Sequence, residues 1–151
     1  MKAFPLVSLL LGSLVLEAAT SAPVVLPVPT AQTVTLVVSS LASTHSVVTI
    51  NLYNDSEKFL KSGQHAMHLI VRPEGKNTIS VPVQLAPGEW AVALSQDTND
   101  NNKLDKNFLG IPTEPYAFSN NIRPRFAAPK FEECKFVVDG PGKVINITLK
   151  Q

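Results

Sequence analysis

The sequence predicts an all-β protein, an antiparallel β-sandwich of about seven strands with at most one short helix. Two observations predict this fold. Apolar residues recur at every second position in seven separate runs, and turn-forming residues separate most of these runs. The chain has 151 residues, with 13 Lys and Arg against 12 Asp and Glu. This length suits one domain, and the near-neutral charge offers no basic surface for nucleic acid.

The first four expected strands alternate apolar and polar residues. They cover residues 33–39, 48–53, 67–71 and 79–85. Alternation with period two is typical of strands that bury one face and expose the other. Pro82 stands in the middle of the fourth run and has no backbone N–H to donate to a neighbouring strand. We therefore expect the fourth strand to lie at the edge of a sheet.

Three further strands are expected after the Ala-Pro-Gly turn at residues 86–88. The run 90–95 has apolar or small residues on both faces, which favours a central strand. The other two runs are 134–138 and 145–149, on either side of a Gly-Pro-Gly turn. Residues 56–62 contain the single helical pattern, which Gly63 closes. We expect one or two helical turns there.

The N-terminal segment has the layout of a secretory signal peptide. Lys2 supplies a positive charge, residues 4–16 are apolar, and small residues follow. The apolar run is too short to span a bilayer, which needs roughly 20 residues. We expect cleavage after Ser21, with Ala19 as an alternative, so that residues 1–21 are removed. The protein is therefore expected to be secreted or periplasmic.

The expected mature chain begins with an extended, proline-rich leader at 22–32, and residues 33–151 form one domain. No cysteine stands at its start, so a lipoprotein anchor is not expected. Cys134 is the single cysteine and cannot form an intramolecular disulfide. Its position in a strand pattern favours a buried, small hydrophobic side chain over a reactive thiolate.

An Asp- and Asn-rich segment at 97–119 interrupts the strand pattern and has the spacing of a calcium loop. Positions 1, 3, 5 and 9 of that register carry side-chain oxygens, and position 7 supplies a backbone carbonyl; the residues are Asp97, Asn99, Asn101, Asp105 and, for the carbonyl, Lys103. Phe108 stands at position 12, where a bidentate glutamate is usual, so Glu114 or Asp100 would supply a third carboxylate. The alternative is that these side chains bond only to their own backbone.

Four motifs between Leu85 and Phe136 resemble a family of small secreted bacterial domains of unknown function. They are P-G-E-W-A-V, D-x-N-x-N-x-K-L-D, N-x-x-G-I-P-x-E-P-Y-x-F-S and P-x-F-E-x-C-x-F. The resemblance implies an exported prealbumin-like or immunoglobulin-like sandwich with no assigned activity. This chain departs from the family pattern at Cys134, where a small residue is usual. It also departs at Asp100 and Asn102, where glycine is common.

No catalytic constellation is evident in the sequence, so we do not expect an enzyme. There is no G-x-S-x-G motif, and no histidine lies in the Asp/Asn-rich segment. His65 and His68 are three residues apart, and in a strand such residues point to opposite faces, so no zinc site is expected. A hydrolase that uses the carboxylates of Asp105 and Glu114 remains the alternative.

A second candidate surface combines charged and aromatic residues, and its members are Glu114, Tyr116, Arg123 and Arg125. Such a mixture suits a glycan or a partner protein. The alternative is that this long connection covers one end of the sandwich and buries its own aromatic rings. The sequence thus favours a non-catalytic binding or structural module, with calcium as the one cofactor considered. No nucleic acid and no membrane span are expected.

Overall fold

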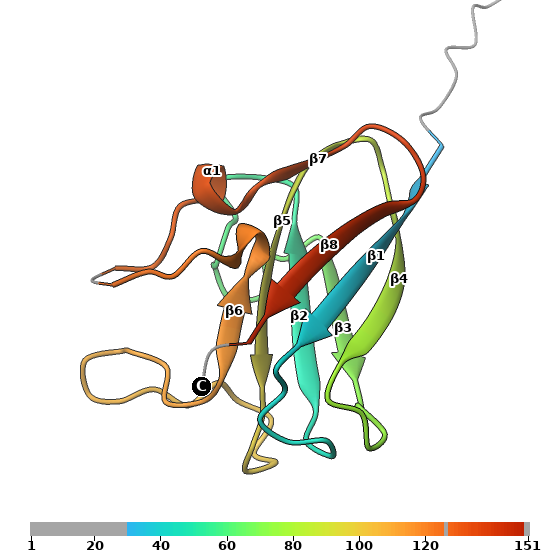
Figure 1. Cartoon of the computed structure of the whole chain (residues 1–151). Coiled ribbons are helices and arrows are strands. Elements are labelled where there is room, and N and C mark those ends of the chain that lie inside the picture. Colours follow the sequence, from blue (N-terminus) through green and yellow to red (C-terminus); the bar gives the residue numbers. More distant parts are fainter. Residues whose placement is uncertain (1–29, 126, 150–151) are drawn as a thin grey trace, which may run out of the picture.

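The computed structural model describes residues 30–125 and 127–149, which form two packed β-sheets (Figure 1). The eight strands are β1 (Gln32–Ser39), β2 (Val48–Tyr53), β3 (Met67–Val71), β4 (Ile79–Leu85), β5 (Gly88–Gln96), β6 (Tyr116–Phe118), β7 (Phe136–Val138) and β8 (Lys143–Thr148). A 3-10 turn, η1 (Ser119–Asn121), and one short helix, α1 (Phe131–Cys134), complete the fold. The expected all-β sandwich with at most one short helix is confirmed.

The strand order explains two features of the sequence. One sheet has the order β4-β1-β8, and the other has the order β3-β2-β5-β6, with β7 also paired to β5. Pro82 lies in β4, an edge strand, and β5 lies between neighbours, as expected. The expectation of a purely antiparallel sandwich is wrong in one place, because β8 runs parallel to β1. The chain reaches β8 from β7, which lies in the other sheet. No hairpin joins β8 to β1, so the two strands are not forced to pair antiparallel.

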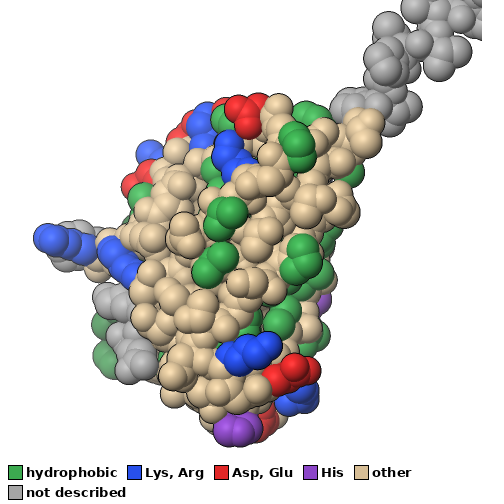
Figure 2. All heavy atoms as spheres, turned by 45° about the vertical axis from the view of Figure 1, so that its right-hand side comes forward, with side chains coloured by type: hydrophobic (Ala, Val, Ile, Leu, Met, Phe, Trp, Pro, Cys, Tyr) green, Lys and Arg blue, Asp and Glu red, His purple; other side chains and the backbone are tan. Residues whose placement is uncertain are grey.

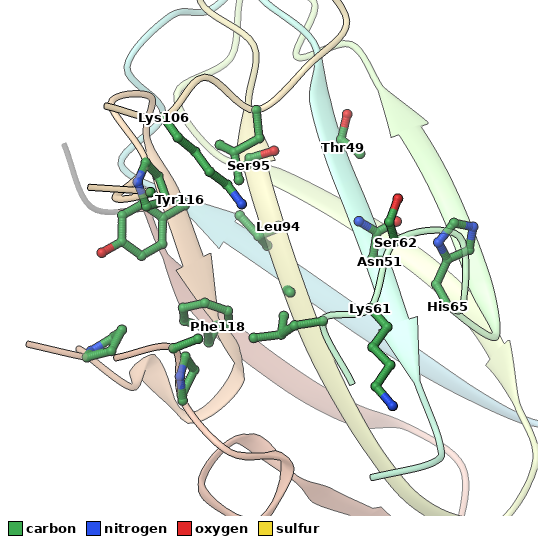
Figure 3. Close-up of a pocket in the computed structure, with 18 of the residues that line it drawn as sticks. Thr49, Asn51, Lys61, Ser62, His65, Leu94, Ser95, Lys106, Tyr116 and Phe118 are labelled. Carbon is green, nitrogen blue, oxygen red and sulfur yellow. The ribbon is translucent and has the colours of Figure 1, made fainter. Parts of the chain in front are cut away.

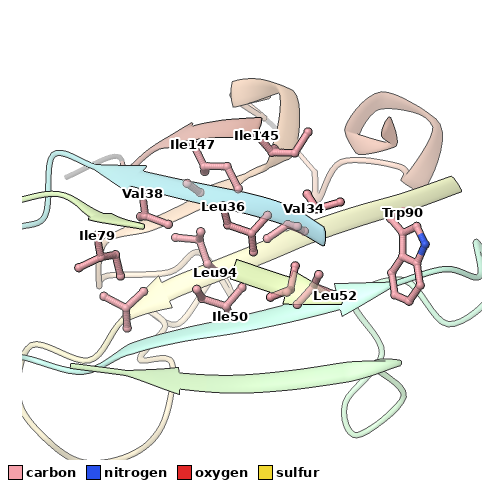
Figure 4. Close-up of a cluster of buried hydrophobic side chains, with 14 of the residues drawn as sticks. Val34, Leu36, Val38, Ile50, Leu52, Ile79, Trp90, Leu94, Ile145 and Ile147 are labelled. Carbon is pink, nitrogen blue, oxygen red and sulfur yellow. The ribbon is translucent and has the colours of Figure 1, made fainter. Parts of the chain in front are cut away.

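The main core lies between the two sheets and is built by alternate residues of each strand (Figure 4). Leu36 of β1 and Ile147 of β8 face Ile50 and Leu52 of β2, and all four are fully buried. Burying each such side chain stabilises the fold by about 1.5–3 kcal/mol. The Trp90 indole N–H donates to the carbonyl of Ala86 at 2.9 Å, which satisfies its polar atom at the end of the core.

A second, smaller cluster covers part of the other face of the five-stranded sheet. Its buried members are Tyr53, Ala91, Phe118, Phe131 and Cys134. Phe59 packs edge-on against both Tyr53 and Phe131, with ring centroids 5.3 and 5.8 Å apart. Residues of α1 together with Phe59 and Leu60 thus cover part of this face.

Three local expectations are wrong. Residues 56–62 form successive turns instead of a helix, with Lys58 N–H bonded to Asp55 and Lys61 N–H to Lys58. The Asp55 carboxylate accepts the N–H of Glu57 at 2.9 Å, as a helix N-cap would, but Leu60 has a φ of 60°, which lies outside the right-handed helical region and stops a helix from continuing. Cys134 ends α1 instead of beginning a strand, and residues 116–118 of the expected long loop form β6.

The N-terminal predictions fall mostly outside the described residues. The proposed signal peptide at 1–21 and most of the 22–32 leader lie there, while Gln32 already belongs to β1. None of the helices within 30–125 and 127–149 is long and apolar enough to cross a membrane.

Candidate functional site

The segment between β5 and β6 is anchored to the sheet at both ends. The N–H of Asp97 donates to the carbonyl of Val47, and the N–H of Gln96 donates to that of Pro115, both at 2.9 Å. Glu114 is buried, and its two carboxylate oxygens accept the N–H groups of Thr98 at 2.8 Å and Asp105 at 3.1 Å. Because both oxygens bind the backbone, Glu114 clamps the two arms of this segment together. It is not part of an exposed surface, contrary to expectation.

Asp97 curls the segment from within. Its carboxylate is buried and accepts the N–H of Asn101 at 3.1 Å and the N–H of Asn102 at 2.6 Å. Asp100 and Asn102 both have positive φ, at 58° and 61°. Glycine enters this region without steric cost, which other residues pay. Asp and Asn are tolerated there better than other residues.

The predicted calcium ligands are brought together in this curl. The amide nitrogen of Asn99 donates to the Asp105 carboxylate at 2.6 Å, and that of Asn101 donates to both Asp105 oxygens at 3.0 and 2.9 Å. The Asn101 side-chain oxygen accepts the N–H of Lys103 at 2.9 Å. The alternative of side chains that bond to their own segment is thus also observed. Within the described residues, no three His, Cys, Asp or Glu side chains gather closely enough to hold a metal.

A groove of about 710 Å³ lies beside this segment, on the half of the sheet that the second cluster leaves open. Its floor carries small and polar side chains from β2 and β5, namely Thr49, Asn51, Ala93 and Ser95. These are the residues that alternate with the buried core positions of the same strands. We call it the outer-face groove (Figure 3).

Two projecting segments border the outer-face groove on the β6 side of the molecule (Figure 1). One holds Lys106 and Ile111 and precedes β6, and the other holds Pro124 and Arg125 and follows η1. In Figure 3, Lys106 reaches over β5 toward Ser95, while His65 lies on the opposite side. The groove thus has the two projecting segments on its β6 side and His65 on the other side.

The second candidate surface is divided by the structure. Tyr116 and Arg125 both line the outer-face groove, whereas Arg123 donates to the backbone carbonyl of Thr148 at 2.8 Å and contacts β8 instead. Sequence reasoning missed Lys61 and Lys106, which line the same groove. The polar residues that alternate along β2 were the one available signal for its floor.

The expectation that His65 and His68 point to opposite faces is wrong. Their rings stack with centroids 4.9 Å apart, and both line the outer-face groove. The reason is that His65 precedes β3, so strand periodicity does not govern it. His68 also shares a 2.7 Å hydrogen bond with the side-chain oxygen of Asn51.

Cys134 is buried and chemically quiet. Burial, with a smaller contribution from the charge of Glu133, raises the pKa of its thiol to about 12. Ser119 links α1 to β5, because its hydroxyl donates to the carbonyl of Cys134 at 2.5 Å and accepts the N–H of Val92 at 2.8 Å. A thiol in this state is protonated at neutral pH, so it is a poor nucleophile.

Comparison with known proteins gives one family. A family model described as an uncharacterized protein conserved in bacteria (DUF2141) matches residues 36–146, well over half of the chain. Searches of curated proteins and of solved structures found no match. The matched range spans both sheets and the segment between β5 and β6.

Proposed function

The chain belongs to the DUF2141 family of uncharacterised bacterial proteins, and on that premise we propose that it is an exported, non-catalytic binding module with a calcium-stabilised loop. The loop is the curl from Asp97 to Asp105. It forms one border of the outer-face groove, where the ligand binds. Calcium holds the border in place, and the sandwich supplies a rigid base.

One observation carries this proposal, the convergence of the side chains of Asp97, Asn99, Asn101 and Asp105 in a single curl. Carboxylate, amide and carbonyl oxygens are the hard donors that calcium prefers, and in the calcium-bound protein we expect those of these four residues and the Lys103 carbonyl to turn toward the ion. Calcium would take the place of the two amide nitrogens that now bind the Asp105 carboxylate. With only two carboxylates in the set, we expect weak affinity, on the order of 10⁻⁴ to 10⁻³ M.

The burial and hydrogen bonds of Glu114, the second carboxylate of the hydrolase alternative, support a non-catalytic role. Glu114 is buried and both of its oxygens accept backbone N–H groups. A general acid or nucleophile needs an oxygen that can reach the substrate. The hydrolase alternative predicts an activity that Asp105→Asn removes without unfolding the protein.

Thermal and urea unfolding of the purified protein, in calcium and in chelator, tests the proposal. At about 5 mM calcium and the affinity expected here, the free energy of unfolding should rise by about 1–2 kcal/mol. Asp105→Ala should abolish this rise, because it removes a ligand that makes no contact with the backbone. Magnesium at the same concentration should have a smaller effect, since it demands a tighter octahedral site.

Asp100→Asn is the matched control. Asp100, one of the two candidates for a third carboxylate, is exposed, and we place it outside the ligand set because the observed contacts of Asn99 and Asn101 are with Asp105. The variant loses the same charge, keeps a residue that tolerates the positive φ of this position, and should keep the calcium response. The proposal fails if calcium leaves the stability of the unmodified protein unchanged. It also fails if Asp105→Ala and Asp100→Asn respond to calcium alike.

A further inference from the structure

The outer-face groove is lined by an excess of positive charge. Its basic residues are Lys61, Lys103, Lys106 and Arg125, and none of them forms an ion pair within the described residues. The single acidic residue in its lining is Asp97. Its side chain is buried, and both carboxylate oxygens accept hydrogen bonds from backbone N–H groups. The whole chain carries a formal charge of only +1, so this concentration is local. A cleft lined by one sign of charge attracts ligands of the other sign.

The floor of the groove selects for a ligand that uses side-chain hydrogen bonds. β2 is paired to β3 and β5, and β5 is paired to β2 and β6, so the floor strands have no free backbone edge. A peptide that recognises a protein by adding a strand needs such an edge. Thr49, Asn51 and Ser95 instead present hydroxyl and amide groups, which both donate and accept. Sugar hydroxyls have the same dual character.

Tyr116 adds an aromatic surface at the β6 border of the groove. It is half-buried, and its ring lies edge-on to Phe118 with the centroids 5.8 Å apart, which fixes its orientation. A flat, oriented ring suits the apolar C–H face of a pyranose. In Figure 3, Tyr116 and Lys106 lie on the same side of the groove, so a ring face and a cation are presented together.

We propose that the outer-face groove binds an anionic oligosaccharide whose carboxylates pair with Lys106 and Arg125 while a sugar ring packs on Tyr116. The groove volume of about 710 Å³ is within the usual range for pockets that hold small ligands. The proposal rests on the binding role proposed above, but not on calcium.

Titration calorimetry with a trimer of galacturonic acid tests the proposal, with the fully methyl-esterified trimer as the matched neutral ligand. Both titrations are made in chelator, because uronates themselves bind calcium. The acidic trimer should bind at least about tenfold more tightly, and its affinity should fall as salt is raised. Lys106→Gln and Arg125→Gln should each weaken its binding by about three- to tenfold while leaving the esterified trimer unaffected.

Two controls keep the result specific. Lys76→Gln removes an exposed charge that does not line the groove, and it should leave binding unchanged. Tyr116→Ala should weaken the binding of both trimers, since it removes the ring and not a charge. Circular dichroism and thermal unfolding confirm that each variant remains folded.

Three outcomes overturn the proposal. If the two trimers bind equally well, the groove binds carbohydrate but does not recognise its charge. Tighter binding of a glutamate hexapeptide than of the acidic trimer would identify an acidic peptide as the ligand. If neither trimer nor the hexapeptide binds, the groove is not a site for polyanions. The unfolding measurement would still decide independently whether the loop binds calcium.

Discussion

The two faces of the five-stranded sheet use the same strands for different purposes. Ile50 and Val92 point into the core and are fully buried, whereas their neighbours Asn51 and Ala93 point into the outer-face groove. On the covered part of the outer face, Cys134 and Phe131 are as buried as core residues. The comparison shows that membership of a strand does not decide whether a residue is buried. The segments packed over that residue decide it.

Figure 2 shows a third kind of surface, on the side of the molecule turned forward from the right of Figure 1. There hydrophobic side chains lie singly among polar groups, and charged side chains gather toward the two ends. By contrast, four exposed hydrophobic residues lie in the single segment before β6; they are Leu104, Phe108, Leu109 and Ile111. Leu104, Leu109 and Ile111 line the groove, which adds apolar contact to its charged border.

The largest expected effect comes from truncation of the core face. Ile50→Ala should lower the free energy of unfolding by about 2–5 kcal/mol, because it leaves a cavity between the sheets. Asn51→Ala, one residue further on the same strand, should lower it by no more than about 1.5 kcal/mol, through the loss of its hydrogen bond with His68. Urea unfolding measures both. Similar losses for the two variants would contradict the distinction between the faces.

The reactivity of Cys134 tests whether the covered half of the outer face excludes solvent like the core. The pKa of Cys134 is raised to about 12, so the folded protein favours the protonated thiol. The stability that the protein gains from this preference is fully present below the ordinary thiol pKa and is lost as the pH rises through about 12. At pH 8, iodoacetamide should modify native Cys134 on the order of 100-fold more slowly than urea-unfolded protein.

Ser95→Cys in a Cys134→Ala background is the control, since it places a thiol on the open half of the same face. It should react within about tenfold of the unfolded chain. Equal native rates at positions 134 and 95 would show that the second cluster does not seal its half of the sheet.

The smallest expected effect concerns a single hydroxyl on the covered half. Ser119→Ala should lower the free energy of unfolding by about 1–3 kcal/mol, because it leaves the buried N–H of Val92 and carbonyl of Cys134 without their partner. Ser95→Ala on the groove floor removes the same atom and should cost no more than about 0.5 kcal/mol. Chemical unfolding of the pair decides whether burial causes the difference.

Some of the candidate site could be predicted from the sequence because its parts are local. The curl from Asp97 to Asp105 depends on side chains that reach backbone only two to five residues away, so spacing alone indicated it. The clamp by Glu114 and the divergence of Arg123 from Arg125 depend on where distant segments lie. No spacing along the chain contains that information.

By itself, the sequence determined the class of fold, the positions of most strands, the edge position of β4 and the polar character of the segment after β5. Period two, proline chemistry and turn residues act within a few residues, so they can be read along the chain. The tertiary structure alone decided the parallel pairing of β8, the short strand β6, the stacked histidines and the groove that unites Lys61 with Lys106. Those features arise from contacts between segments far apart in sequence, where packing over a sheet decides which positions are covered and which stay open.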